Sequence, residues 1–420
     1  MPGDQSTGKG GAMRAEENGI GALPGALDLT AQEPIPDAGV KAALALFASG
    51  KMHRYGEASG VPAEAALLEA EFAAGIGRRY AIGLNSCGST MFVALKCLDV
   101  GPGDTVLSNA FTLAPVPGAV AHAGARLRLL DITDDLTVDL DDLERKAAGA
   151  KALLLSHMRG HIADLPRVAA ICRRHGVALV EDCAHTMGAG WAGRPTGSFG
   201  AVGCFSLQSY KHANGGEGGL LVTDDDDIAA RAILFSGSYM HWRAHRARPA
   251  DAVFERWQYV TPNFSLRMSN LVAAIVRPQM GEALAERGRR WNARYHWLAG
   301  GLATIAGVRL PRRAPQEQYV QSSIQFLVPG ATEGQMRRFI AAAAARGVNV
   351  KWFGDPEPVG FTSHWTSWRY AETHERLPNA ARVLATLCDV RIPLTLTQDD
   401  CARVVAVIDE ALALARAAPA

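Results

Sequence analysis

The chain of 420 residues lacks the features of several protein classes. No apolar run approaches the ~20 residues that span a bilayer, and the polar, glycine-rich start of the chain has no hydrophobic signal segment. The formal net charge is only +1, which disfavours nucleic acid and anionic membranes as partners. The seven cysteines are scattered and form no C-x-x-C pair, so neither a disulfide framework nor a zinc ribbon is expected. These absences favour a cytoplasmic protein of enzyme size.

Hydrophobic residues make up 48% of the chain and occur in short runs that alternate with amphipathic segments. Runs typical of strands lie at 105–107, 126–130, 152–156, 177–180, 201–205 and 220–223. Apolar spacing predicts helices over 64–76 and 165–175, and one long helical stretch over about 269–302. The alternation predicts an α/β domain with a mostly parallel sheet. We expect a flexible tail over 1–25, a large domain over 26–285 and a smaller α+β domain over 286–420.

One aspartate and one lysine stand at the ends of two predicted strands. Asp182 closes an apolar run, and Lys211 lies between another such run and the glycine-rich turn 216–219. Pyridoxal phosphate needs these two groups, because a carboxylate keeps its pyridine nitrogen protonated and a lysine amine forms a Schiff base with it. Taken singly, each residue also has an ordinary interpretation, as a solvated loop lysine and as a cap of the next element.

Three further motifs have competing interpretations. Residues 85–90, Asn-Ser-Cys-Gly-Ser-Thr, precede an apolar helix whose first N–H groups either bind a phosphate or are simply capped by a serine. Residues 188–193 match G-x-G-x-x-G but run into predicted turns, so dinucleotide binding is not expected. His157 and His161 are four residues apart, yet Gly160 between them argues against the helix on which such a pair would bind a metal. We therefore expect no metal site.

Taken together, the motifs resemble those of the DegT/DnrJ/EryC1/StrS aminotransferases. The resemblance rests on 85–89, 181–185, 197–200, 205–211, 216–219 and 267–279, and it covers nearly all of residues 30–410. It implies a fold type I enzyme that uses pyridoxal phosphate to aminate keto sugars or cyclitol ketones, with an amino-acid donor such as glutamate or glutamine. It also implies a homodimer whose active sites lie between two subunits.

The resemblance implies roles for the residues that match the family's motifs. Lys211 would be the Schiff-base lysine and the group that moves the proton, and Asp182 would bind the pyridine nitrogen. His185 would lie near the phenolic oxygen of the cofactor. His157 matches a strand-end histidine of the family, and Arg159 stands where a neutral residue is usual. Arg159 would either bind a carboxylate or phosphate of the substrate or form a surface ion pair.

The phosphate of the cofactor has its own expected partners. Ser206 and the backbone of Gly88 and Ser89 would hold it, as the resemblance implies. Asn263 or Arg267 would reach the same site from the second subunit. Asn263 lies four residues before Arg267, whereas two is usual in the family.

Two aromatic positions leave alternatives open. The residue that stacks on the pyridine ring aligns with Leu113, and Phe111, two positions earlier, is the alternative for that contact. Trp352 belongs to a group of aromatic residues in the predicted small domain. It either packs in the core or lines a substrate pocket. Cys87 stands where the family commonly has glycine.

The sequence therefore predicts a homodimeric aminotransferase that acts on a sugar, a cyclitol or a similar polar ketone. Relatives that dehydrate sugars replace the Schiff-base lysine, and the presence of Lys211 favours amino transfer. A lyase or replacement enzyme acting on an amino-acid-like substrate is the alternative, since one fold hosts several such reactions. A regulator that binds the cofactor would need a DNA-binding module, and the short polar segment before residue 26 does not resemble one.

Overall fold

The computed structural model describes residues 27–55, 61–371 and 375–417. The predicted tail over 1–25 lies outside these ranges. Within them, no helix has both the length and the apolar character needed to cross a bilayer. The cytoplasmic location stays a prediction.

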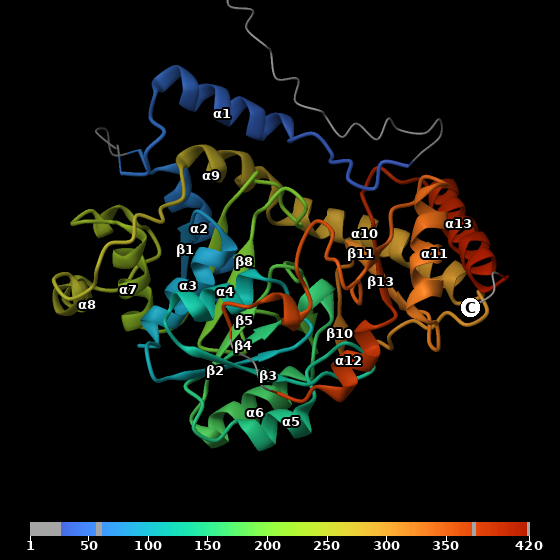
Figure 1. Cartoon of the computed structure of the whole chain (residues 1–420). Coiled ribbons are helices and arrows are strands. Elements are labelled where there is room, and N and C mark those ends of the chain that lie inside the picture. The colour runs from blue at the N-terminus through green and yellow to red at the C-terminus, as the bar shows by residue number, and fades with distance from the viewer. Residues whose placement is uncertain (1–26, 56–60, 372–374, 418–420) are drawn as a thin grey trace, which may run out of the picture.

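The larger domain is built on a seven-stranded sheet of order β1-β9-β8-β5-β4-β2-β3 (Figure 1). Its strands are β1 (Tyr80–Leu84), β2 (Thr105–Asn109), β3 (Arg126–Leu130), β4 (Ala152–Ser156), β5 (Ala178–Asp182), β8 (Val202–Ser206) and β9 (Gly219–Thr223). All neighbours pair in parallel except those of β9, which is antiparallel to both β1 and β8. The predicted mostly parallel α/β sheet is therefore confirmed. The apolar runs 126–130 and 152–156 coincide with β3 and β4, while β1 was not among the predicted strands.

Helices cover both faces of this sheet, which buries alternate strand residues on opposite sides. Leu154 of β4 packs in the core with α3, α4 and α7, whereas Leu153 and Leu155 pack with α5 and α6. The helices of this part of the chain are α1 (Asp37–Ser49), α2 (Glu64–Ile76), α3 (Cys87–Cys97), α4 (Pro115–His122), α5 (Leu140–Lys146), α6 (Leu165–His175), α7 (Asp226–Ser236), α8 (Asp251–Trp257) and α9 (Asn270–Val276). The predictions over 64–76 and 165–175 match α2 and α6. In α6 the side chain of Asp164 caps the first turn, and Gly176 ends the helix at φ 67°.

The predicted continuous helix over 269–302 is interrupted. Helix α9 ends at Val276, a 3₁₀ turn follows at Arg277–Gln279, and α10 begins at Glu282. Pro278 lies in that turn, and Gly281 has a φ of 60°, a conformation that L side chains rarely adopt. The chain thus changes direction between the two helices.

The smaller domain has its own sheet of order β11-β13-β12 and its own core. Its elements are α10 (Glu282–Leu302), β11 (Ser323–Leu327), α11 (Glu333–Ala344), β12 (Lys351–Trp352), β13 (Leu387–Arg391) and α13 (Gln398–Ala417), grouped at the right of Figure 1. Leu29, near the start of the described chain, joins this core, whereas α12 (Pro378–Leu384) packs in the core of the larger domain. Leu29 and α12 thus each pack in the core of the domain to which their neighbours in sequence do not belong.

The short strands β6 (Gly190–Trp191) and β7 (Arg194–Pro195) form a hairpin that pairs with β10 (Glu317–Gln318). The glycine pattern at 188–193 thus belongs to a hairpin and opens no helix, as the predicted turns indicated.

Candidate active site

Three parallel strands end side by side and bring polar side chains together. Ser156 closes β4 and pairs with Asp182 at the end of β5, while Ser206 closes the neighbouring β8. The Ser156 hydroxyl donates a hydrogen bond to Asp182 Oδ2 at 2.8 Å, and the Ala184 N–H donates to Oδ1 at 3.1 Å. Two donors therefore hold this buried carboxylate in one orientation at the carboxyl edge of the sheet.

Lys211 lies in the loop after β8, and its amine meets His185. Lys211 Nζ is 3.0 Å from His185 Nε2. Burial and the positive charge of Arg159 lower the pKa of Lys211 from 10.5 to about 8, although the nearby Asp182 acts in the opposite direction. Burial, together with the charge of Lys211, lowers the pKa of His185 well below 6.5. At neutral pH the His185 ring is therefore uncharged and accepts a hydrogen bond from the lysine amine.

The start of α3 faces the glycine-rich turn. Ser86 accepts a hydrogen bond from the Ser89 N–H at 3.1 Å, so a serine does cap this helix. An added Cβ at Gly219 would come within 2.5 Å of Ser86 O, which means that the turn packs tightly against the cap. At Gly88, in contrast, an added Cβ would meet nothing closer than Ser86 Oγ at 3.7 Å. The backbone at Gly88 thus has room for a ligand beside a helix N-terminus.

A cavity of about 310 Å³ opens beside Lys211 and His185, between the two domains. Leu113 and Arg159 of the larger domain line it, and so does Arg391 at the end of β13 in the smaller domain. Arg159 is almost fully buried and pairs with Asp389, its Nη2 lying 3.1 Å from Oδ2. Of the two interpretations of Arg159, the surface ion pair is therefore excluded, because both the arginine and its partner are buried.

Of the residues predicted for the site, Asp182, Ser206, Gly88 and Ser89 do not line this cavity, and three others have partners elsewhere. Phe111 is fully buried in the core with its ring 5.1 Å from that of Phe353, so Leu113 rather than Phe111 lines the cavity. Trp352 packs in the core of the smaller domain and donates its indole N–H to Ala385 O, which corrects the proposed contact with substrate. His157 points to Glu181, 3.3 Å away, and does not line the cavity.

Asn263 and Arg267 lie together, but they do not line the cavity of their own chain. The Arg267 guanidinium donates to Gly237 O at 2.9 Å and lies over the ring of Tyr239. Asn263 accepts a hydrogen bond from the Ser265 N–H. Their predicted contact with the phosphate of a second subunit stays a prediction.

The histidines considered for a metal do not converge. His157 Nε2 lies near Glu181, whereas His161 Nε2 is 2.8 Å from Gln325 Oε1. Among the described residues, His157, Glu181 and Cys183 have ligand atoms within 4.8 Å of one another. The Glu181 carboxylate, however, already accepts three backbone N–H groups of the loop 197–200 at 2.7 to 2.8 Å. This cluster therefore holds that loop in place.

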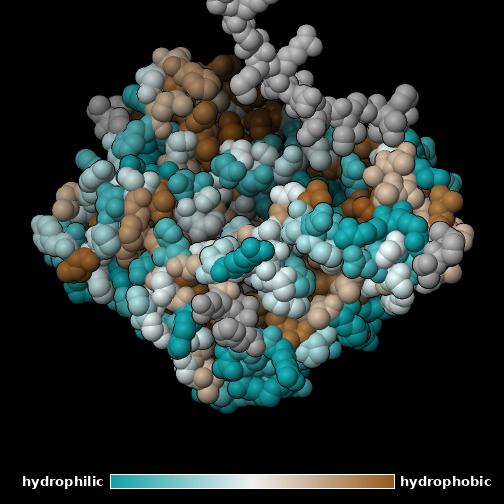
Figure 2. All heavy atoms as spheres, in the orientation of Figure 1, coloured by the Kyte–Doolittle hydropathy of each residue, from teal (hydrophilic) through white to brown (hydrophobic). Residues whose placement is uncertain are grey.

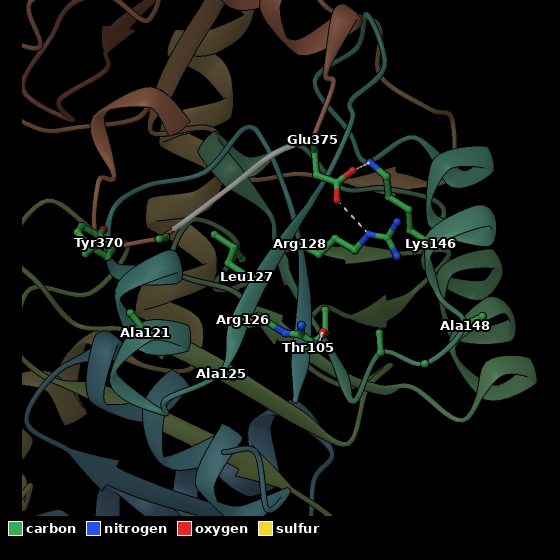
Figure 3. A pocket seen from close by; sticks show the side chains of 13 residues that line it. Thr105, Ala121, Ala125, Arg126, Leu127, Arg128, Lys146, Ala148, Tyr370 and Glu375 are labelled. Atoms are coloured by element: carbon green, nitrogen blue, oxygen red, sulfur yellow. Dashed lines mark hydrogen bonds and ion pairs between the residues drawn. The ribbon is translucent and has the colours of Figure 1, made fainter. Parts of the chain in front are cut away.

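A second cavity of about 610 Å³ lies at the β3 edge of the large sheet, and Lys211 is not part of its lining (Figure 3). Glu375 stands between Arg128 and Lys146 and pairs with each at 3.1 Å. Glu375 offsets only one of the basic groups here, because Arg126 also lines the cavity, and neither Asp182 nor His185 is part of its lining.

Two polar residues of the site were missing from the sequence prediction. Ser156, which orients Asp182, follows an apolar run and has no local motif. Arg391 had a signal, because Asp389 and Arg391 lie two apart in the otherwise apolar strand β13 and so share one face of it. That pattern marks a polar surface on a buried strand.

The residues present fit pyridoxal phosphate. A buried amine of lowered pKa and an oriented carboxylate lie close enough for the carboxylate to influence the pKa of the amine, and the backbone at Gly88 leaves room at a helix N-terminus. Lys211, Asp182, His185 and the start of α3 would hold the group, with Ser206 at the neighbouring strand end.

Comparison with known proteins gives the following similarities. A model of the DegT/DnrJ/EryC1/StrS aminotransferase family matches residues 49–409. The chain is 32% identical over 213 residues to the spore coat polysaccharide biosynthesis protein SpsC of Bacillus subtilis, which is 50% of this chain and 54% of SpsC. It is 32% identical over 228 residues to GDP-perosamine synthase of Caulobacter vibrioides, 53% of this chain and 58% of that protein. The chain thus spans about half the length of the curated relatives it matches. The crystal structure of AtS13 from Actinomadura melliaura aligns with a TM-score of 0.75 and 27% identity, over 92% of this chain and 98% of AtS13.

Proposed function

We infer that this chain, which belongs to the DegT/DnrJ/EryC1/StrS aminotransferase family, is an aminotransferase dependent on pyridoxal phosphate. Its reaction would move an amino group from an amino-acid donor, such as glutamate or glutamine, to a keto sugar, a cyclitol or a similar polar ketone. The observation that carries this proposal is the approach of Lys211 Nζ to His185 Nε2, at 3.0 Å, beside a cavity, with the oriented carboxylate of Asp182 near enough to act on the pKa of the lysine. The family's cofactor, when bound, supplies the electron sink for this chemistry.

Each residue of the site has a role that its surroundings support. Lys211 is the Schiff-base lysine of this proposal, and its lowered pKa keeps part of the amine uncharged and nucleophilic at neutral pH. The same Nζ would then move a proton between substrate and cofactor. His185 accepts the hydrogen bond of that amine and positions it. Asp182, held by Ser156, would keep the pyridine nitrogen protonated.

We further propose that the enzyme is a homodimer. Val40, Leu44 and Phe47 form a stripe of exposed apolar side chains at helical spacing along α1, and hydrophobic residues gather over this helix at the top of Figure 2. Leu44 is 60% exposed and Phe47 is 59% exposed. The position of Asn263 and Arg267 outside their own cavity agrees with a site that a second subunit completes.

Replacement of Lys211 by alanine tests the proposal. Borohydride reduction of the wild-type protein with added pyridoxal phosphate, followed by peptide mass spectrometry, should find the cofactor on the peptide that contains Lys211. In the Lys211→Ala variant the label and most of the turnover with glutamate or glutamine should be lost. Lys151→Ala is the control, because Lys151 lies on the surface and pairs only loosely with Asp104. Labelling of another lysine, or full turnover without Lys211, would show that the proposed role is wrong. Protein that carries the cofactor on Lys211 but does not react with glutamate or glutamine would favour the lyase or replacement reaction.

A further inference from the structure

Arg159 and Arg391 approach the Lys211 cavity from two different domains. Arg159 follows strand β4 of the larger domain, and Arg391 ends strand β13 of the smaller one. Both line the cavity together with Lys211. We propose that these two arginines form a site that binds a carboxylate group of the substrate beside Lys211. This proposal deepens the proposed function and rests on it.

The backbone and the partner of Arg159 hold its guanidinium in place. Arg159 has a φ of 55°, a conformation that is costly for a residue with a side chain and that persists only where the surroundings enforce it. Asp389 pairs with Nη2 at 3.1 Å, and Asp389 is itself fixed by Gln325, whose amide donates to it at 2.6 Å. Arg159 Nε is buried and has no hydrogen-bond partner among the described residues. One part of the guanidinium is thus anchored by Asp389, while Nε has no partner among the described residues.

Arg391 is even less satisfied by the protein. Its guanidinium carbon lies 4.1 Å from the centre of the Tyr210 ring, and its Nη1 is buried without a hydrogen-bond partner in the described part of the chain. Burial and the positive charge of Arg159 both lower the pKa of Arg391 from its usual value. Asp389, the partner of Arg159, raises the pKa of Arg391 in turn, but its single charge offsets only one of the two guanidinium groups.

The lining of the cavity has a surplus of positive charge. Its basic side chains are Arg159, Lys211, Arg287 and Arg391, and its acidic one among the described residues is Glu33. Glu33 pairs with Arg287 and Arg290, and Asp389, which is not part of the lining, offsets the charge of Arg159. The charge of Arg391 is left over. A guanidinium presents parallel N–H groups that match the two oxygens of a carboxylate. An acid group on the substrate therefore fits this place better than a neutral hydroxyl would.

A substrate carboxylate has two possible sources, the amino donor and the ketone acceptor. For the donor, the probes are L-glutamate and L-glutamine, each compared with its α-amide. For the acceptor, the probes are succinate and succinamide, which differ in charge and resemble a small acidic acceptor. Calorimetric titration of the holoenzyme measures the binding of each probe without requiring turnover.

The variants separate charge from geometry. Arg159→Lys and Arg391→Lys keep the positive charge but lose the parallel N–H groups of the guanidinium. Arg391→Gln loses both the charge and these N–H groups. Arg231→Lys is the matched control, because Arg231 is also a largely buried arginine with an unpaired Nε, yet it pairs with Asp99 and does not line the cavity. Circular dichroism establishes that each variant is folded, and Arg391 is the more exposed of the two site arginines, so its replacement perturbs folding less.

We expect the wild type to bind each acid more tightly than its amide, and the preference to fall roughly 10-fold or more in the Arg159 and Arg391 variants. A loss confined to glutamate and glutamine assigns the site to the donor. A loss that extends to succinate shows that it also accepts an acidic ketone. Equal binding of acids and amides by the wild type, or wild-type binding by Arg391→Gln, would overturn the proposal. Protein that prefers acids but carries no cofactor on Lys211 would instead refute the proposed function and leave the carboxylate site standing.

Discussion

The lowered pKa of Lys211 leads to a prediction about how fast the apo protein captures its cofactor. Only the uncharged amine attacks the aldehyde of added pyridoxal phosphate. The pKa falls from 10.5 to about 8 because the amine is buried and because Arg159 lies nearby. At pH 7 the uncharged fraction rises from about 1 in 3,000 to about 1 in 10, so capture should be about 300-fold faster than for a solvated lysine.

Replacement of Arg159 by glutamine removes the charge next to the amine. We expect the pKa of Lys211 to rise toward 10.5 without reaching it, because burial, the larger cause, remains. Capture at pH 7 should then be slower than in the wild type, while the two proteins should converge at pH values above both pKa values. The sign is set by the charge, since a neighbouring cation disfavours the protonated amine and its removal favours it.

The assay is the initial rate of covalent attachment between pH 6 and 10, measured by borohydride quenching and mass spectrometry of the Lys211 peptide. The wild-type rate should level off above about pH 8, which is the value that burial and Arg159 together set. A wild-type rate that still rises steeply at pH 10, or an Arg159→Gln profile identical to that of the wild type, would refute the reasoning.

Two further predictions concern the loop beside the site and the assembly. Glu181→Ala leaves three backbone N–H groups of the loop 197–200 without their acceptor, so the free energy of unfolding in urea should fall by about 3 to 6 kcal/mol; a loss below about 1 kcal/mol would mean that water replaces the carboxylate. Leu44→Glu or Phe47→Glu places a charge in the exposed apolar stripe of α1 and should shift the protein to monomer in sedimentation velocity, whereas Ala45→Glu, off the stripe, should not. A monomeric wild type, or dimers in all three variants, would contradict the role of α1.

The family match confirms the resemblance that the motifs indicated, and the sheet confirms the fold. These features were predictable because they are local. A short apolar run such as 152–156 is typical of a buried strand, and Ser86 is a favoured residue for the cap at which α3 begins. The same local logic fails between 276 and 282, where a proline and a glycine interrupt a pattern that is otherwise helical.

Side-chain neighbours were less predictable. Phe111 and Leu113 are two apart in one loop, and only the packing of Phe111 against Phe353 leaves Leu113 as the residue that lines the cavity. Trp352 is an aromatic residue of the kind that often lines pockets, but it is buried in the core of the smaller domain. In both cases the contacts with residues distant in sequence decide which side chain is buried in a core and which lines the cavity.

By itself, the sequence indicated most strands of the larger sheet, the placement of Asp182 at a strand end and of Lys211 between a strand and the glycine-rich turn, and the family that these motifs identify. Those properties follow from periodicity, caps and turns, which act over a few residues. Only the tertiary structure decided that Arg159 is buried against Asp389 and that Arg391 arrives beside it from another domain. The charge of the cavity is a sum over residues that are far apart in the chain, and it exists only where the two domains meet.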